Sequence, residues 1–393
     1  MKTKSQLRGV LAICSLSIAA CGGGSGPGPV GGATGQQGQL GTDAAVSGGA
    51  DASGWVTVGG GDAGAVSTNA YNGRVAVAAN VPYAIFSDSS ASSKLTLMKL
   101  TGGKWTVVGT AGFSTEPAYY YYTLYVDGTT PYVAYVGYTS DTLTVMKFNG
   151  TAWVVVGTAG FASADAYGVT SLVVANGIPY VAFVNSSSQL QVMTFNGTVW
   201  VSLGTGPVST YAYKCVMTVL NGTVYVAYND QTSSPTTMKL VAWSGTAWSL
   251  VAQSTYTIDE DYGQLLTVSN GVLYLIYYNS TYGPIVWKLS GNSLVSVGTL
   301  GSISNGDYVE YVSGTVYNGV PYVAFDDEAR DSDPNPQAAT VKYFDSATST
   351  WRLYAGYANP CDIEDTYLAS DQSTGQIYLT YSDCNGYMTV QVH

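Results

Sequence analysis

Carboxylates and tyrosines are the side chains of this sequence with the widest capacity for chemistry. Its 393 residues include 25 Asp and Glu and 33 Tyr, against 14 Lys and Arg. The one histidine is the last residue, His393, which excludes a histidine-based triad and argues against a histidine zinc site. No Gly-x-Ser-x-Gly, phosphate loop or dinucleotide fingerprint occurs. Two chemistries remain: ligand recognition by phenols and acids, and hydrolysis by a carboxylate pair.

A recurring aromatic pair indicates which elements must position these groups. Seven times a Tyr is followed three residues later by Tyr or Phe, and successive pairs start 45 to 56 residues apart. The pairs are Tyr83/Phe86, Tyr132/Tyr135, Tyr180/Phe183, Tyr225/Tyr228, Tyr274/Tyr277, Tyr322/Phe325 and Tyr378/Tyr381. Such a period indicates one repeated supersecondary unit, and we interpret the pairs as scaffold.

Each unit has the pattern of four short strands. Residues 169–204 contain four runs rich in Val, Tyr, Phe and Leu, separated by Asn-Gly, Ser-rich and Gly-Thr turns. The fourth run opens on Trp in six of the seven units, with Leu294 in the remaining one. This pattern predicts an all-β fold, a seven-bladed β-propeller with four-stranded antiparallel blades. The last unit lacks its Trp strand, so we expect the N-terminal strand at Trp55 to complete it and close the ring.

Chain polarity predicts where the acids and tyrosines gather. The crossings between blades must emerge on the same face as the loops between second and third strands, and 20 of the 25 acids fall in these two kinds of segment. Thirteen tyrosines lie in the crossings, which line the mouth of a propeller's channel. We therefore expect an acidic, Tyr-rich face. The candidate ligand-binding residues are Tyr119, Tyr122, Tyr167, Tyr211, Tyr213, Asp259, Glu260, Asp261, Tyr262, Tyr308, Asp326, Asp327, Glu364, Asp365 and Tyr367.

A structural interpretation of the same residues stays open. Crossings can use Tyr to cover blade tops, and Asp can form Asx turns. The position five residues after the first Tyr of each pair is always Asp, Asn or Gly, as at Asp88 and Asp230, and favours turn chemistry there. Clustered oxygens would suit Ca²⁺, but no cluster has the spacing of a calcium loop, so we expect no cofactor, with Ca²⁺ left open.

The N-terminus carries an export signal over residues 1–21. Lys2, Lys4 and Arg8 precede an apolar stretch too short to span a bilayer. Small residues directly before Cys21 resemble a bacterial lipobox, and the resemblance implies that Cys21 becomes the lipidated N-terminus; an ordinary signal peptide is the alternative. Gly22, rather than Asp, follows Cys21, and this resembles the pattern of enterobacterial lipoproteins that are sorted to the outer membrane. We expect residues 22–50 to be a flexible tether and residues 51–393 the propeller, anchored in the bacterial cell envelope through lipid alone, at the periplasmic face of the outer membrane or at the cell surface.

Charge and cysteines add three expectations. Removing the signal leaves 11 basic residues against 25 acidic ones, a net charge of −14, which argues against nucleic acid and anionic lipid headgroups as partners. Cys361 and Cys384 should lie on one face of the last blade, and in an oxidising compartment they predict a disulfide. Cys215, in an innermost strand, is expected to be a buried small hydrophobe.

The blades, for example NGVPYVAFDD from Asn318, resemble those of exported bacterial β-propeller repeat proteins over residues 51–393. This resemblance implies the fold but no shared activity. Lectin propellers are a looser analogue: they repeat a sugar site between blades, whereas the acidic clusters here lie in late blades, which favours one or two sites. Sialidase-like propellers need several Arg on the binding face, and of Arg74, Arg330 and Arg352 only Arg330 is expected there.

These observations predict a monomeric, non-enzymatic binding propeller that recognises a glycan or a protein through its acidic, Tyr-rich face. One alternative is a glycan-cleaving hydrolase or lyase using carboxylates and tyrosines of the same face. The other alternative is a structural subunit of an envelope complex.

Overall fold

The computed structural model describes residues 54–59, 65–67, 69–164, 170–232, 234, 236–254, 265–305, 307, 309–327, 339–355, 364–382 and 386–393. The chain divides into two compact units, Met1–Leu40 and Gly41–His393, and every described residue belongs to the second. Within the described ranges there is no long apolar helix of the kind that crosses a bilayer.

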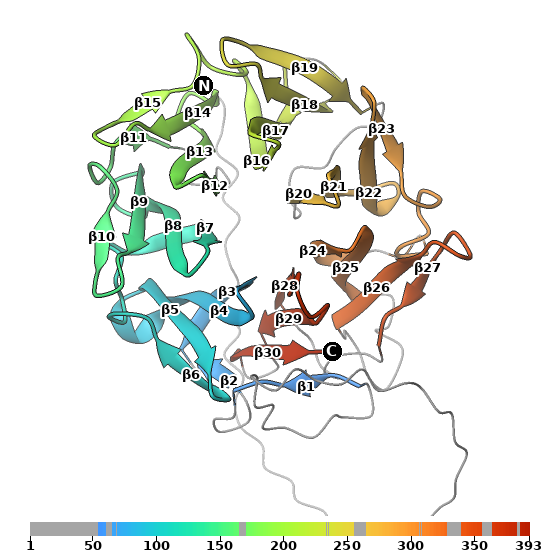
Figure 1. Ribbon diagram of the computed structural model, residues 1–393, viewed down its shortest axis with the longest axis horizontal. Helices are drawn as coiled ribbons and strands as arrows, with labels where there is room; N and C mark the ends of the chain where they lie inside the picture. Colours follow the sequence, from blue (N-terminus) through green and yellow to red (C-terminus); the bar gives the residue numbers. More distant parts are fainter. Residues whose placement is uncertain are drawn as a thin grey trace, which may run out of the picture. The chain divides into compact units, whose positions relative to one another are not determined.

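Seven antiparallel sheets form a ring, which confirms the seven-bladed β-propeller (Figure 1). Blade 1 consists of β3 (Ala70–Ala78), β4 (Val81–Asp88), β5 (Lys94–Thr101) and β6 (Lys104–Val107), with a 3-10 turn at Ser89–Ala91. Blade 2 consists of β7 (Ala118–Asp127), β8 (Thr130–Gly137), β9 (Thr142–Phe148) and β10 (Trp153–Val155), with β11 (Ala162–Ser163) paired to β9. Blade 3 consists of β12 (Ser171–Ala175), β13 (Ile178–Val184), β14 (Leu190–Phe195) and β15 (Trp200–Ser202).

The remaining blades repeat this order from the inside outward. Blade 4 consists of β16 (Ala212–Leu220), β17 (Thr223–Asp230), β18 (Thr237–Trp243) and β19 (Trp248–Gln253). Blade 5 consists of β20 (Leu265–Ser269), β21 (Val272–Asn279), β22 (Gly283–Ser290) and β23 (Ser293–Ser296). Blade 6 consists of β24 (Val309–Tyr317), β25 (Val320–Asp327), β26 (Ala339–Asp345) and β27 (Thr350–Leu353). Blade 7 consists of β28 (Glu364–Ser370), β29 (Ile377–Ser382), β30 (Met388–Val392) and β1 (Val56–Thr57), with β2 (Ala65–Ser67) also paired to β30.

Blade 7 is built from strands of both ends of the sequence. In the antiparallel pair of β1 and β30, Val56 stands opposite Val392 and Thr57 opposite Gln391. The Val58 amide extends the pairing by donating to the Val390 carbonyl at 3.0 Å. The expectation that the N-terminal strand completes the last blade is therefore confirmed, and this pairing closes the ring.

The hydrophobic core lies between the blades. Buried apolar residues form seven clusters, each shared by two neighbouring blades. Members of the repeated aromatic pair belong to them: Phe86, Tyr135 and Phe325 are at most 2% exposed. Their burial confirms the interpretation of the pairs as scaffold.

In blades 1, 2, 3, 4 and 6, a tryptophan of the outermost strand links the blade to the preceding one by a hydrogen bond. The indole Nε1 atoms of Trp105, Trp153, Trp200, Trp248 and Trp351 donate to the carbonyls of Val58, Val108, Val156, Leu203 and Val297 at 2.7–3.1 Å. Each acceptor is followed by a glycine with positive φ, and a Cβ on Gly59 would lie 2.1 Å from the Trp105 ring. In blade 5, Leu294 replaces the Trp. In the preceding blade 4, Ala252 occupies the position equivalent to the glycine. The missing Trp thus coincides with a missing Gly in the blade before it.

Candidate functional site

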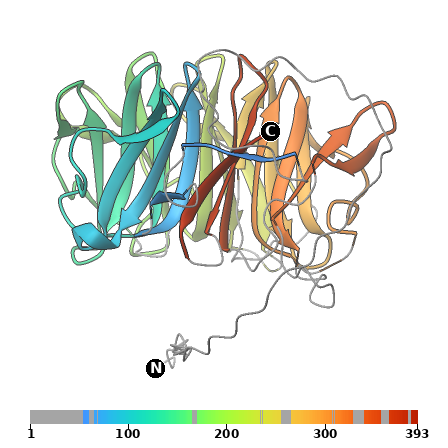
Figure 2. The ribbon, with the colours of Figure 1, turned by 90° about the horizontal axis from the view of Figure 1, so that it is seen from below.

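Three contacts show that the crossings between blades and the loops after the second strands emerge on the same face of the propeller. Figure 2 shows the propeller from the side, with the strands running from one face to the other. Glu116, in the crossing before β7, accepts hydrogen bonds from the amides of Thr139 and Ser140 at 3.1 and 3.2 Å. The hydroxyl of Ser163, in β11 of blade 2 on the way to blade 3, lies 2.9 Å from that of Ser186, in the loop after β13 of blade 3. We call this side of the molecule the crossing face.

Several described acids of the crossing face hold its loops in place. Asp88 accepts from the Ser90 amide at 3.0 Å and from the Thr96 hydroxyl at 2.8 Å. Asp230 pairs with Lys239 Nζ at 2.5 Å. Burial alone would raise the pKa of Asp230, but hydrogen bonds from Lys239, Thr232 and Ser209 together hold it below its ordinary value. These contacts support the turn interpretation for both aspartates.

Part of the predicted site falls outside the described residues. These candidates are Tyr167, Asp259, Glu260, Asp261, Tyr262 and Tyr308. Arg330 and the predicted disulfide partners Cys361 and Cys384 also lie outside them. For Tyr119 and Glu364 the structure describes the backbone, in β7 and β28, but not the side chain.

The other candidates divide between the scaffold, the surface and a central cavity. Tyr122 is fully buried and donates to the Asn72 carbonyl of the neighbouring blade. Asp326 and Asp327 end β25, where Asp326 is 3% exposed. Tyr211 and Tyr213 flank the start of β16, and Tyr211 is 48% exposed. Asp365 and Tyr367, both in β28, line the cavity.

A β-bulge at one level of the inner strands shapes that cavity. The register shifts between Tyr71/Arg74, Ala118/Tyr122, Ala212/Cys215, Glu310/Ser313 and Glu364/Tyr367, in blades 1, 2, 4, 6 and 7. In blades 1, 6 and 7 the bulge stands opposite the second aromatic residue of the repeated pair: Phe86, Phe325 and Tyr381. A bulge redirects side chains and ends regular pairing, and here it does so where the chain enters from the crossing face.

The bulges hold non-glycine residues in the left-handed region of backbone space. Asn72, Tyr311 and Asp365 have φ values of 55°, 47° and 58°. This conformation is common enough for Asn and Asp but an outlier for a residue as bulky as Tyr, at a cost of about 1–3 kcal/mol. Backbone strain of this kind concentrates at functional sites, so it directs attention to this level of the channel.

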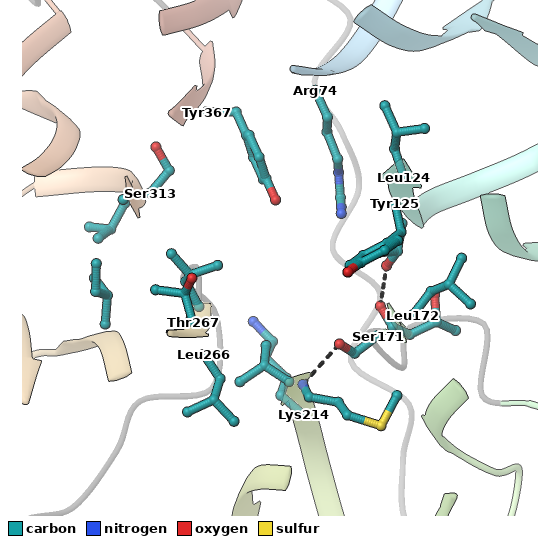
Figure 3. A pocket seen from close by; sticks show the side chains of 18 of the residues that line it. Arg74, Leu124, Tyr125, Ser171, Leu172, Lys214, Leu266, Thr267, Ser313 and Tyr367 are labelled. Atoms are coloured by element: carbon teal, nitrogen blue, oxygen red, sulfur yellow. Dashed lines mark hydrogen bonds between the residues drawn. The ribbon is translucent and has the colours of Figure 1, made fainter. Parts of the chain in front are cut away.

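The central cavity has a volume of about 570 Å³ and is lined by residues from the inner strands of all seven blades (Figure 3). This volume lies within the range of small-molecule sites. Its walls combine apolar side chains such as Leu124 and Leu266 with hydroxyls such as Ser171 and Thr267, and with the charged residues Arg74, Lys214 and Asp365.

Arg74 and Lys214 enter the cavity from blades 1 and 4 (Figure 3). The Arg74 guanidinium lies 5.2 Å from the centre of the Tyr122 ring and 5.8 Å from that of Tyr367, a cation–π arrangement. Burial raises the pKa of the Tyr122 hydroxyl, while Arg74 opposes that rise and Asp365 adds to it, which places both charges near Tyr122. Lys214 is only 5% exposed.

Sequence reasoning missed these two cations. It searched the crossings and loops, whereas Arg74 and Lys214 lie inside the first strand of their blades. The available signal was a basic residue within a run otherwise expected to be the innermost, apolar strand. The bulges interrupt the alternation of side chains along these strands. Because the sequence did not reveal the bulges, alternation alone could not predict that Arg74 and Lys214 face the channel.

Hydrogen bonds between inner strands fix the walls of the cavity. The Thr123 hydroxyl donates to the Thr170 carbonyl, and the Met217 amide donates to the Ser171 hydroxyl at 2.9 Å, as the dashed lines of Figure 3 show. The Thr366 hydroxyl donates to the Tyr311 carbonyl at the opposite side of the ring. These contacts join blades 2, 3 and 4, and blades 6 and 7.

Two other expectations concern thiols and metals. Cys215 is buried in the core between blades 3 and 4, and burial raises its pKa to about 12, as expected for an unreactive thiol. Within the described ranges, no group of three or more His, Cys, Asp and Glu side chains is arranged to hold a metal ion.

Comparison with known proteins supports the fold. No family model and no curated protein matches the sequence. A puromycin hydrolase structure is 8% identical with a TM-score of 0.54; the match covers 83% of this chain but only about half, 52%, of the hydrolase. A six-bladed fucose-recognising lectin from Aleuria aurantia is 12% identical with a TM-score of 0.49, over 75% of this chain and 98% of the lectin. AofleA from Arthrobotrys oligospora is 10% identical with a TM-score of 0.48, over 74% and 88%. At 8% identity, the likeness to the puromycin hydrolase structure concerns the fold alone.

Proposed function

We propose that this protein is a non-catalytic binding propeller that takes a glycan into its central cavity from the crossing face. The observation that carries the proposal is the cavity, where bulged strands bring phenols, hydroxyls and charges together within about 570 Å³. A sugar needs polar partners for its hydroxyls and flat apolar surface for its ring faces. Tyrosine supplies both, at a low cost in conformational entropy.

Two buried hydroxyls support a polar ligand. Thr170 Oγ1 and Ser313 Oγ both belong to residues that line the cavity, and neither has a hydrogen-bond partner among the described residues. Buried polar groups are nearly always satisfied, by protein, ordered water or ligand. Rotation of the two side chains toward the cavity would bring these hydroxyls within reach of a bound glycan.

Exposed tyrosines support approach from the crossing face. Tyr71, Tyr138 and Tyr211 are 58%, 58% and 48% exposed. Tyr71 is the second residue of β3, Tyr138 follows β8 and Tyr211 precedes β16, so strand polarity places all three on that face. They would contact sugar units that extend beyond the cavity.

The lining supports binding over cleavage. Hydrolysis of glycosidic bonds ordinarily uses two carboxylates, one on each side of the scissile bond. Asp365 is the one carboxylate among the described residues that line the cavity. The described lining therefore lacks the second member of such a pair.

Blocking the cavity tests the proposal. The purified protein is applied to an array of neutral and acidic oligosaccharides, and the solutions are assayed for cleavage products. We expect binding without products, and loss of at least ~10-fold in affinity in Thr267→Trp, since the new ring would occupy the cavity. Thr106→Trp on the exposed outer strand β6 is the matched control. Product release, or equal binding by both variants, would contradict the proposal.

We also propose that Cys21 anchors the propeller in the cell envelope. Residues 22–50, as a Gly-rich coil, would span on the order of 30 Å root-mean-square and let the crossing face reach its ligand. Radiolabelled palmitate fed to expressing bacteria should label the wild-type protein and not Cys21→Ala. The variant should then appear in the soluble envelope fraction. Equal labelling of the two proteins would refute the anchor.

A further inference from the structure

The charged side chains of the described cavity lining are mainly basic, whereas those of the whole chain are mainly acidic. The sequence holds 25 acidic residues and 14 basic ones. The described lining of the cavity instead holds two basic side chains, Arg74 and Lys214, and one acidic side chain, Asp365. A cationic site in an acidic protein is not a consequence of composition, so it calls for a specific reason.

The two cations are set in walls that strengthen their effect. Apolar side chains from several blades, among them Leu172, Leu266 and Val312, line the cavity beside them. Charge–charge interactions are stronger in such surroundings than in bulk water and are less screened by salt. Lys214 is 5% exposed, and its Nζ atom lies 5.7 Å from the centre of the Tyr213 ring.

Both cations face the same cavity. Arg74 comes from blade 1 and Lys214 from blade 4, and both extend toward the middle of the cavity in Figure 3. The Tyr122 and Tyr367 rings, 5.2 and 5.8 Å from the Arg74 guanidinium, restrict its position. A guanidinium can bind a carboxylate through two parallel hydrogen bonds, and an ammonium adds a point charge.

We infer that the cavity recognises an acidic glycan by its uronic acid carboxylate, which Arg74 and Lys214 hold between them. This inference rests on the proposed function and adds the chemical class of the ligand. Four residues that carry hydroxyl groups, Thr170, Ser171, Thr267 and Ser313, line the same cavity, and hydroxyls suit the polar groups of a sugar ring. That setting favours a uronate over the carboxylate of a peptide.

Isothermal titration calorimetry with two matched ligands tests the inference. The purified wild-type protein is titrated with trigalacturonate and with its fully methyl-esterified form, which keeps the sugar rings and removes the charge. We expect the acid to bind on the order of 10- to 100-fold more tightly than the ester, the range of charge-assisted hydrogen bonds. Affinity for the acid should fall less steeply with salt than it would for an exposed charge pair, and affinity for the ester should not change.

Variants assign the effect to the two cations. Arg74→Gln and Lys214→Met should each lower affinity for the acid by about 10- to 100-fold and leave affinity for the ester unchanged. Lys104→Met, on exposed outer strand β6, is the matched control and should bind both ligands as the wild type does. Thermal melting of each variant checks that its fold is intact.

The possible outcomes distinguish failure of uronate recognition from failure of glycan binding. Equal affinity of the wild type for acid and ester overturns the uronate inference and leaves glycan binding standing. Binding of neither trisaccharide, together with a blank oligosaccharide array, overturns the proposed function itself. Binding of acidic peptides in place of both trisaccharides also overturns the inference.

Discussion

Deleting residues 54–59 is expected to abolish cooperative folding of the propeller. These residues carry β1, which pairs with β30, and Trp55, which is 1% exposed in the core between blades 6 and 7. Truncating a buried Trp alone costs about 3–5 kcal/mol, a large part of the ~5–15 kcal/mol that stabilises a typical domain. The deletion also leaves β30 as an open sheet edge that can pair with another chain.

Urea unfolding and light scattering measure both effects. The variant should unfold over a broad range well below the wild-type midpoint and should form aggregates. Deletion of six residues within the expected tether, 30–35, is the matched control and should leave the midpoint unchanged. A 54–59 deletion variant that melts cooperatively at the wild-type midpoint would show that the ring does not depend on this strand.

Trp200→Ala is expected to destabilise the propeller by about 3–5 kcal/mol. Trp200 donates to the Val156 carbonyl at 2.8 Å and stacks on Phe161 with ring centres 4.7 Å apart. Its removal leaves a cavity between blades 2 and 3 and an unsatisfied carbonyl. Trp200→Phe keeps much of the ring and loses the donor, so it should cost roughly 1–3 kcal/mol.

The shift of the urea midpoint at constant slope reports these losses. Val201→Ala, the next residue and 36% exposed, is the matched control and should change stability by no more than about 0.5 kcal/mol. If Trp200→Ala and Val201→Ala unfold alike, the indole contacts between blades contribute little and the account of how blades are fastened is wrong.

The fold could be predicted because each blade repeats the same physical requirements. The aromatic pairs recur because each blade must bury large rings against its neighbours, and Phe86 and Phe325 lie in equivalent places. The strand that follows Trp55 has no repeat in front of it in the sequence. The last repeat lacks its outermost strand, so pairing beside β30 was the position predicted for it. Periodicity and strand polarity together left few alternatives.

The site could be predicted only in part, because it depends on departures from the repeat. Asp365 and Tyr367 were expected and line the cavity, while Arg74 and Lys214 were not expected. The bulges that shape the cavity have no common sequence: Asn-Gly forms the one in blade 1, and Tyr-Lys the one in blade 4. Aspartates such as Asp88 satisfy loop amides, a local role that composition cannot separate from ligand binding.

Diffraction from crystals of the protein soaked in trigalacturonate would locate the ligand. We expect electron density for a sugar inside the ring of bulged strands, with a carboxylate within hydrogen-bond distance of both Arg74 and Lys214. Density for the sugar in a groove between blades at the outer rim, with only water in the central cavity, would contradict this expectation.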